Sequence, residues 1–239
     1  MRCRITKLNQ IEHIELGIFW SGKMPSPNTN TSTSSKAPSA LLKTRHLYDS
    51  EYYLTGCEGF GCDANILSPR LQSVYNAALS HLKGIVLDAG CGRGELTIRA
   101  ARLDTVQQVH SIDYSPAAIK LLLDSLSKET TATIDKIHVH MGTIDLFLSY
   151  TNVLYDCVLL SDVVEHIPFV AAQALIADLS LVTKTIIVST PISQDHANER
   201  HLWLARSEGD IMKMAPDFQV TNHGYAGSGE DYIFELTKR

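Results

Sequence analysis

Short apolar runs alternate with amphipathic segments along most of this chain. The apolar runs are rich in Val, Ile and Leu, which is typical of strands that are buried on both faces of a parallel sheet. These runs are too short for periodicity alone to distinguish a strand from a buried helix. We therefore assign them as strands from their spacing along the chain and from the turn residues that flank them. The runs that predict strands are 85–88, 108–112, 136–140, 155–161, 184–189, 218–222 and 232–236.

The amphipathic segments between these runs predict helices. In the segment after Ser68 and Pro69, apolar residues recur at helical spacing as far as about residue 81. Ser115 also stands before a proline, and serine followed by proline is a typical helix start. The predicted helices are 69–81, 95–103, 116–128, 168–182 and 201–214. Strands and helices that alternate through short connections predict an α/β fold, a largely parallel sheet sandwiched between helices.

Residues 1 to about 45 differ in character from the rest. The segment 24–39 is rich in Ser, Thr and Pro, and it holds too little apolar surface to offset the entropy lost on ordering. This composition predicts a disordered linker. The segment 11–20 has some amphipathic character, but its apolar core is short for a signal peptide and no small-residue cleavage site follows it. We therefore expect an extension over 1–45 and a folded domain over 46–239.

Composition narrows the choice of partners and compartment. With a net charge of -5 the chain has no overall positive field that would attract nucleic acid or an anionic membrane. No apolar run approaches the ~20 residues of a membrane helix. The five cysteines are odd in number and scattered, which suits reduced thiols in the cytoplasm. Cys57 and Cys62 supply at most half of a metal site, and unpaired thiols are the favoured interpretation. We expect a cytoplasmic protein that binds neither membrane nor nucleic acid.

The run that follows the first predicted strand carries the clearest chemistry. Gly90, Gly92 and Gly94 stand at alternate positions, where they allow positive φ and let a ligand lie against the backbone. A glycine turn between a strand and a helix is the nucleotide site of doubly wound folds. Asp113 ends the second strand, where an acid can take a pair of ribose hydroxyls. Asp88 precedes the turn and would repel a pyrophosphate, but it suits a cationic cofactor without phosphate.

An acidic strand end followed by Gly-x-Gly-x-Gly resembles motif I of the class I S-adenosylmethionine (SAM) methyltransferases. The resemblance extends from about residue 48 to the C-terminus. It implies a three-layer sandwich whose seventh strand is antiparallel, with the order 3-2-1-4-5-7-6, and SAM as the cofactor. A dinucleotide-dependent oxidoreductase is disfavoured by Asp88 and by the glycine spacing.

The resemblance also implies a set of cofactor contacts. The turn Gly90, Cys91, Gly92 and Gly94 would admit the methionine part of SAM, with Asp88 on its ammonium side. Asp113 would hold the ribose, and Tyr114 would lie by the adenine. The family usually has a Gly-Asp pair near the adenine; Gly142 and Thr143 stand there, so Asp145 is the acid that can substitute. Ser161 ends the fourth strand, which is aimed at the cofactor.

The aromatic and acidic stretch 48–59 resembles an N-terminal lid segment of a bacterial subgroup of these enzymes. Such segments fold over the cofactor and shape the acceptor site, which predicts a lid over 46–82. Packing of these tyrosines on the sheet is the alternative interpretation, and it stays open here.

A second group of chemical residues follows the fourth strand, at the edge where α/β sheets bind substrates. If 162–166 form a helical turn, Asp162, Glu165 and His166 share one face. They can then hold a divalent cation, present His166 as a base that an acid orients, or cap a turn. A Glu-His pair is widespread in the family, and an acid-x-x-Glu-His set with a later histidine resembles the metal site of small-RNA 2′-O-methyltransferases.

The later histidine is expected in the loop 195–201, which opens on the same sheet edge. We expect His196 to reach the acceptor; alternatively, His196 and His201 are ordinary surface-loop residues. The predicted function is O-methylation of a small or medium-sized acceptor, with His166 or His196 taking its proton. A metal-assisted RNA 2′-O-methyltransferase and a non-catalytic SAM-binding module are the alternatives. The negative charge weakens the first, and the intact Asp162, Glu165 and His166 argue against the second.

Overall fold

The computed structural model describes residues 48–49, 51–53, 67–192, 201–203, 205, 207–226, 229 and 231–239. The predicted extension over 1–45 with its linker, Cys57, Cys62 and His196 lie outside these residues. What we expect of them therefore stays a prediction.

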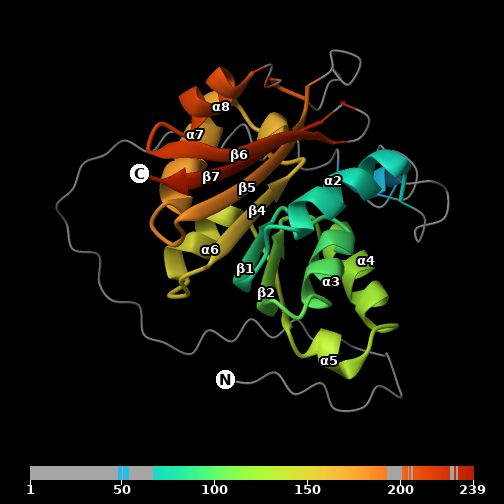
Figure 1. Ribbon diagram of the computed structural model, residues 1–239. Coiled ribbons are helices and arrows are strands. Elements are labelled where there is room, and N and C mark those ends of the chain that lie inside the picture. The colour runs from blue at the N-terminus through green and yellow to red at the C-terminus, as the bar shows by residue number, and fades with distance from the viewer. Residues whose placement is uncertain are drawn as a thin grey trace. The chain divides into compact units, whose positions relative to one another are not determined.

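Seven strands form one sheet with the order β3-β2-β1-β4-β5-β7-β6 (Figure 1). Neighbouring strands run parallel from β3 to β5, and β7 is antiparallel to both β5 and β6. The predicted α/β class and strand order are thereby confirmed. The strands are β1 (Gly84–Ala89), β2 (Val106–Asp113), β3 (Ile137–Met141), β4 (Cys157–Ser161), β5 (Thr185–Pro191), β6 (Phe218–Ala226) and β7 (Asp231–Lys238).

Helices cover both faces of this sheet (Figure 1). One apolar cluster joins α6, α7 and α8 to one face, and a second joins α2 and α3 to the other, so that Leu87 and Val86 of β1 point into different clusters. This is the predicted three-layer arrangement. The helical elements are α2 (Pro69–Leu79), α3 (Glu95–Ala101), α4 (Pro116–Leu126), α5 (Thr131–Ile134), α6 (Ile144–Tyr150), a 3₁₀ turn η3 (Val164–His166), α7 (Phe169–Leu179) and α8 (Glu208–Met214).

Two helices begin where the serine-proline pairs predict. The Ser68 hydroxyl accepts a hydrogen bond from Leu71 N at 3.2 Å, and the Ser115 hydroxyl accepts one from Ala118 N at 3.3 Å. Each serine thereby satisfies a backbone N–H that has no partner inside its helix. The second of these caps lies directly behind the predicted cofactor site.

The largest departures from the predicted helices and strands are in α8, in β6 and in two short helices. The helix predicted over 201–214 begins only at Glu208, because Ser207 caps it there and accepts from Asp210 N at 3.3 Å. Strand β6 continues four residues beyond the predicted end at 222, since it pairs with β7 as far as Ala226. The short helices α5 and α6 were not predicted, because so few turns carry little periodicity.

Candidate active site

The three glycines of the turn after β1 have different neighbours. All three have positive φ, at 86°, 52° and 84° for Gly90, Gly92 and Gly94. A Cβ at Gly90 would lie 2.6 Å from Val163 Cγ2, and one at Gly94 would collide with the Leu122 side chain. Packing alone therefore requires glycine at 90 and 94. At Gly92 the nearest described atom would be Tyr53 Cε1 at 3.7 Å, an ordinary contact distance, so of the three glycines Gly92 is the one that packing alone does not require.

Asp113 ties the glycine turn to the start of α4. Its Oδ2 accepts from Gly92 N at 3.0 Å, and its Oδ1 accepts from Ser115 N at 2.8 Å. Burial raises the pKa of this carboxyl group. Each carboxylate oxygen has a second lone pair, so both can still accept hydrogen bonds from vicinal hydroxyls. The arrangement is compatible with the ribose contact predicted for Asp113, which stays a prediction.

Asp88 lies behind the turn and is 2% exposed. Its Oδ2 accepts a hydrogen bond from the Thr97 hydroxyl of α3 at 2.6 Å. Burial, more than any neighbouring charge, raises the pKa of Asp88 from 3.8 to about 6. A cationic ligand group near this carboxyl would favour its charged form, which agrees with the expected ammonium side of the cofactor.

The raised pKa predicts how stability depends on pH. Between about pH 4 and pH 6 the folded state keeps a proton on Asp88 that the unfolded state has lost. The contribution of this group to the free energy of unfolding therefore falls as pH rises through that window, by about 3 kcal/mol in total. Asp88→Asn is expected to remove this fall, which denaturant titrations from pH 4 to 7.5 measure. The exposed Asp124→Asn is the control, and an unchanged pH slope in Asp88→Asn would contradict the assignment.

Several predicted cofactor residues are engaged elsewhere. The Ser161 hydroxyl lies 2.8 Å from the Ser189 hydroxyl of β5, and Cys91 packs in an apolar cluster with Ile98 and Leu122. Burial raises the pKa of the Cys91 thiol well above its usual value, so this residue can contribute through its backbone. The cofactor-binding roles predicted for Ser161 and Cys91 stay predictions. Thr143 and Asp145 are exposed at the start of α6, and Gly142 N donates to Asp113 O at 3.0 Å.

The prediction that Asp162, Glu165 and His166 share one helical face is wrong. Asp162 has a left-handed backbone, with φ 52°, and the helical turn η3 begins only after it. Its carboxylate lies 3.8 Å from Nη2 of Arg70 on α2. Arg70 also forms an ion pair with Asp231, which is fully buried at the start of β7. Asp162 is therefore directed toward α2, in an ion network that spans three segments.

Glu165 is fully buried, with 0% exposure. Its Oε2 accepts from the Thr190 hydroxyl of β5 at 3.3 Å, whereas Oε1 has no hydrogen-bond partner among the described residues. Burial, and after it the Asp162 carboxylate, raises the pKa of Glu165 well above its usual value. A buried carboxyl oxygen of this kind is costly unless a proton, a cation or a ligand satisfies it.

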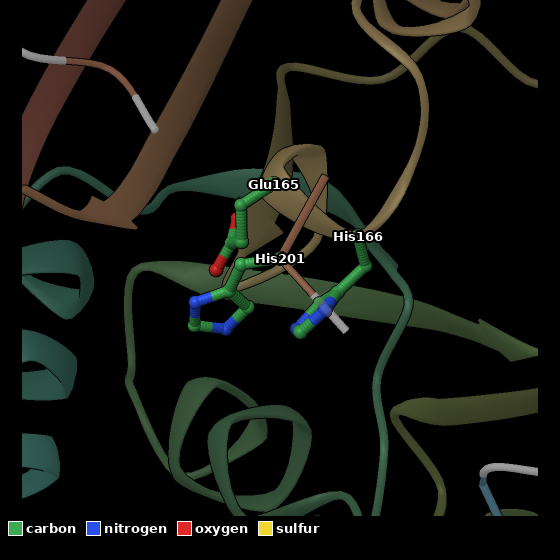
Figure 2. A group of neighbouring side chains, drawn as sticks. All are labelled: Glu165, His166 and His201. Carbon is green, nitrogen blue, oxygen red and sulfur yellow. The ribbon is translucent and has the colours of Figure 1, made fainter. Parts of the chain in front are cut away.

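His201 joins Glu165 and His166 in one cluster. One ligand atom from each residue lies within 4.8 Å of the other two, and Figure 2 shows the three side chains together. Leu202 N donates to Glu165 O at 2.7 Å, and the Trp203 indole donates to Val164 O at 2.8 Å. These bonds hold the segment 201–203 against η3. His201 therefore lies with Glu165 and His166, and a chemical role for it stays a prediction. The position of its loop after β5 is the sequence feature that indicated this edge of the sheet.

The described part of the lid, residues 48–49 and 51–53, lies against this same group; we call it the lid segment. Tyr52 N donates to the Asp49 carboxylate at 2.9 Å, which folds the segment into a turn. The Tyr48 ring makes edge contacts with Tyr52, Tyr114 and His166, at centroid distances of 4.9, 5.9 and 5.7 Å. Tyr48 thus contacts Tyr114, a predicted cofactor residue, and His166, a predicted acceptor residue.

The fold and this site define a class I methyltransferase. A family model described as a methyltransferase domain matches residues 80–214, which is more than half of the chain. The chain therefore belongs to this methyltransferase family, and the predicted SAM-dependent enzyme class is confirmed. No curated protein matches the chain. Among the described residues no helix is both long enough and apolar enough to cross a membrane.

Solved structures with the same fold are similar to this chain. Magnesium protoporphyrin IX methyltransferase from Synechocystis PCC 6803, with bound SAM, is 20% identical with a TM-score of 0.60, covering 88% of this chain and 100% of that one. The methyltransferase domain of bacterial CtHen1-C is 20% identical with a TM-score of 0.56, covering 70% and 98%. The glycopeptide N-methyltransferase MtfA is 14% identical with a TM-score of 0.58, covering 72% and 91%. At these identities the likeness shows the fold.

Proposed function

We propose that this methyltransferase acts on an oxygen atom of a small or medium-sized acceptor, an alcohol or a phenol. The observation that carries the proposal is the cluster of Glu165, His166 and His201 beside the Tyr48 ring. Glu165 and His166 follow β4 and His201 follows β5, at the carboxyl edge where substrates of α/β enzymes bind. It combines an imidazole base with a buried acid, which are the groups that removal of a hydroxyl proton needs.

SAM, when bound, supplies an electrophilic methyl carbon on a sulfonium centre. The chain's residues fit it: Gly92 has room for a Cβ, Asp113 offers two acceptor oxygens, and Tyr114 follows Asp113 in the chain. We propose these three as the methionine, ribose and adenine contacts. Support for these roles comes from the family resemblance and from the room for a Cβ at Gly92.

His166 is the proposed general base for the acceptor hydroxyl. Its ring lies 4.8 Å from that of His201 by centroids, and the Glu165 carboxyl group belongs to the same cluster. In its ionised form the Glu165 carboxyl group would stabilise the imidazolium ion that forms when His166 takes the proton, and that positive charge would in turn favour ionisation against the effect of burial. The lid segment, which contacts His166 through Tyr48, helps to exclude water and to align the acceptor.

The same cluster supports a second candidate, a metal-assisted RNA 2′-O-methyltransferase. Two imidazoles and a carboxylate suit a divalent transition metal, and the unsatisfied Glu165 Oε1 fits such an ion. His201 supplies the later histidine of the metal pattern. However, the first acid of that pattern, Asp162, is directed toward Arg70, and the chain's net charge of -5 does not attract RNA. These two observations favour the small acceptor.

One labelling experiment separates the two candidates. The protein is incubated with methyl-labelled SAM and an extract of its own cells, with and without ribonuclease and with and without EDTA. We expect the label in a small, ribonuclease-resistant product, with no effect of EDTA, and mass spectrometry should place the methyl group on oxygen. Label that enters RNA and is lost with EDTA would establish the second candidate. A methyl group on nitrogen or carbon would overturn the proposed O-methylation.

A further inference from the structure

We infer that Arg93 and Ser115 are positioning residues that hold the lid segment closed over the cofactor. The inference rests on the cofactor site proposed above. The sequence motifs assign neither residue a role at the cofactor site, and both side chains reach a backbone carbonyl of the lid segment.

Two hydrogen bonds hold the backbone of the lid segment, and we call them clasps; Arg93 forms the first. It stands between Gly92 and Gly94, and it is 4% exposed. Its Nη1 donates to Tyr53 O at 2.8 Å, while its Nε lies 2.9 Å from Glu95 Oε1. Glu95 thus fixes the guanidinium group, and another of its N–H donors reaches the lid segment. A buried, charge-assisted hydrogen bond of this kind is among the stronger ones in proteins.

Ser115 forms the second clasp at the other end of the lid segment. Its hydroxyl donates to Tyr48 O at 2.7 Å while it accepts from Ala118 N, and its own N–H donates to Asp113. The two clasps therefore extend from the two segments that the cofactor is expected to contact, the glycine turn and the end of β2. Movement of either segment on cofactor binding would be passed to the lid segment.

The clasped lid segment covers the expected cofactor position. Tyr53, which is 6% exposed, places its Cε1 over the open side of Gly92. Tyr48 lies between Tyr114, on the adenine side, and His166, on the acceptor side. A cofactor held between Gly92 and Tyr114 is thus covered by rings whose backbone Arg93 and Ser115 hold in place. Its release requires the lid segment to open.

The test measures the dissociation rate of S-adenosylhomocysteine by stopped-flow displacement, which needs no acceptor. Arg93→Ala is expected to speed dissociation by about 10-fold or more, with a smaller change in the association rate. Arg93→Lys keeps a donor and should restore part of the slow rate. Arg102→Ala, which removes an exposed arginine paired with Glu129 at the end of α3, is the matched control and should leave the rate unchanged.

A second variant guards against loss of the fold. Ser115→Gly removes the hydroxyl donor, and glycine is an acceptable helix cap, so α4 should keep its start. Both clasps act on the same lid segment, so the double variant should release the ligand little faster than either single variant. Folded variants that all release it at the wild-type rate would overturn the inference. If the wild-type protein fails to bind S-adenosylhomocysteine at all, it is the cofactor assignment that fails.

Discussion

Gly92→Val is expected to reduce the affinity for SAM by at least ~100-fold, or about 2.7 kcal/mol. Gly92 is the glycine of the turn that has space beside it, with Tyr53 Cε1 as the nearest described neighbour of a Cβ at 3.7 Å. A valine side chain would occupy the volume between the turn and the Tyr53 ring, where the methionine part of the cofactor is expected. Titration calorimetry with SAM and with NAD measures the effect on both ligands.

Two other glycine variants separate ligand exclusion from backbone strain. Gly229 has φ 92° and no described atom within 4 Å of a Cβ, so Gly229→Val introduces similar strain away from the turn and should keep SAM affinity. Gly94→Val should instead lower the melting temperature, because its side chain would collide with Leu122. If Gly92→Val binds SAM as tightly as the wild type, the proposed cofactor position is wrong.

His166→Ala is expected to lower turnover by ~100-fold or more while the affinity for SAM is unchanged. The His166 imidazole is the proposed base, and the cofactor contacts lie on β1, β2 and the segments that follow them. His201→Ala should also lower turnover, since it removes the ring beside His166 and leaves the Glu165 carboxyl group exposed to water. Initial rates with the acceptor that labelled SAM identifies provide the measurement.

Controls distinguish the roles open to these histidines. His223→Ala removes an exposed histidine of β6 and should leave the rate unchanged. EDTA should not change the turnover of the wild-type enzyme if His166 is a general base that binds no metal. If EDTA stops turnover and a divalent ion restores it, the cluster holds a metal instead. Should both histidine variants turn over at the wild-type rate, the cluster has no chemical role and alignment alone accounts for catalysis.

The fold is largely encoded in local sequence patterns. Each strand of the sheet coincides with an apolar run, and α2 and α4 begin at the serines that precede a proline. The glycine turn after β1 and the acid at the end of β2 are equally local, because they depend on φ and on position along one strand. Spacing along the chain suffices for such features, so the α/β class and the cofactor motif are predictable without coordinates.

The direction of the chemical side chains depends on distant segments. The left-handed backbone at Asp162 turns its carboxylate toward Arg70 on α2, so the helical spacing that grouped it with Glu165 and His166 does not apply. His201 reaches the cluster because hydrogen bonds from Leu202 and Trp203 hold its segment against η3.

The clasps of Arg93 and Ser115 likewise join residues that lie 40 and 67 positions apart in the chain. The amino-acid sequence therefore determines which elements form and where the glycine turn lies. Only the tertiary structure decides which side chains meet at the site, because those contacts depend on how segments far apart in the chain pack together.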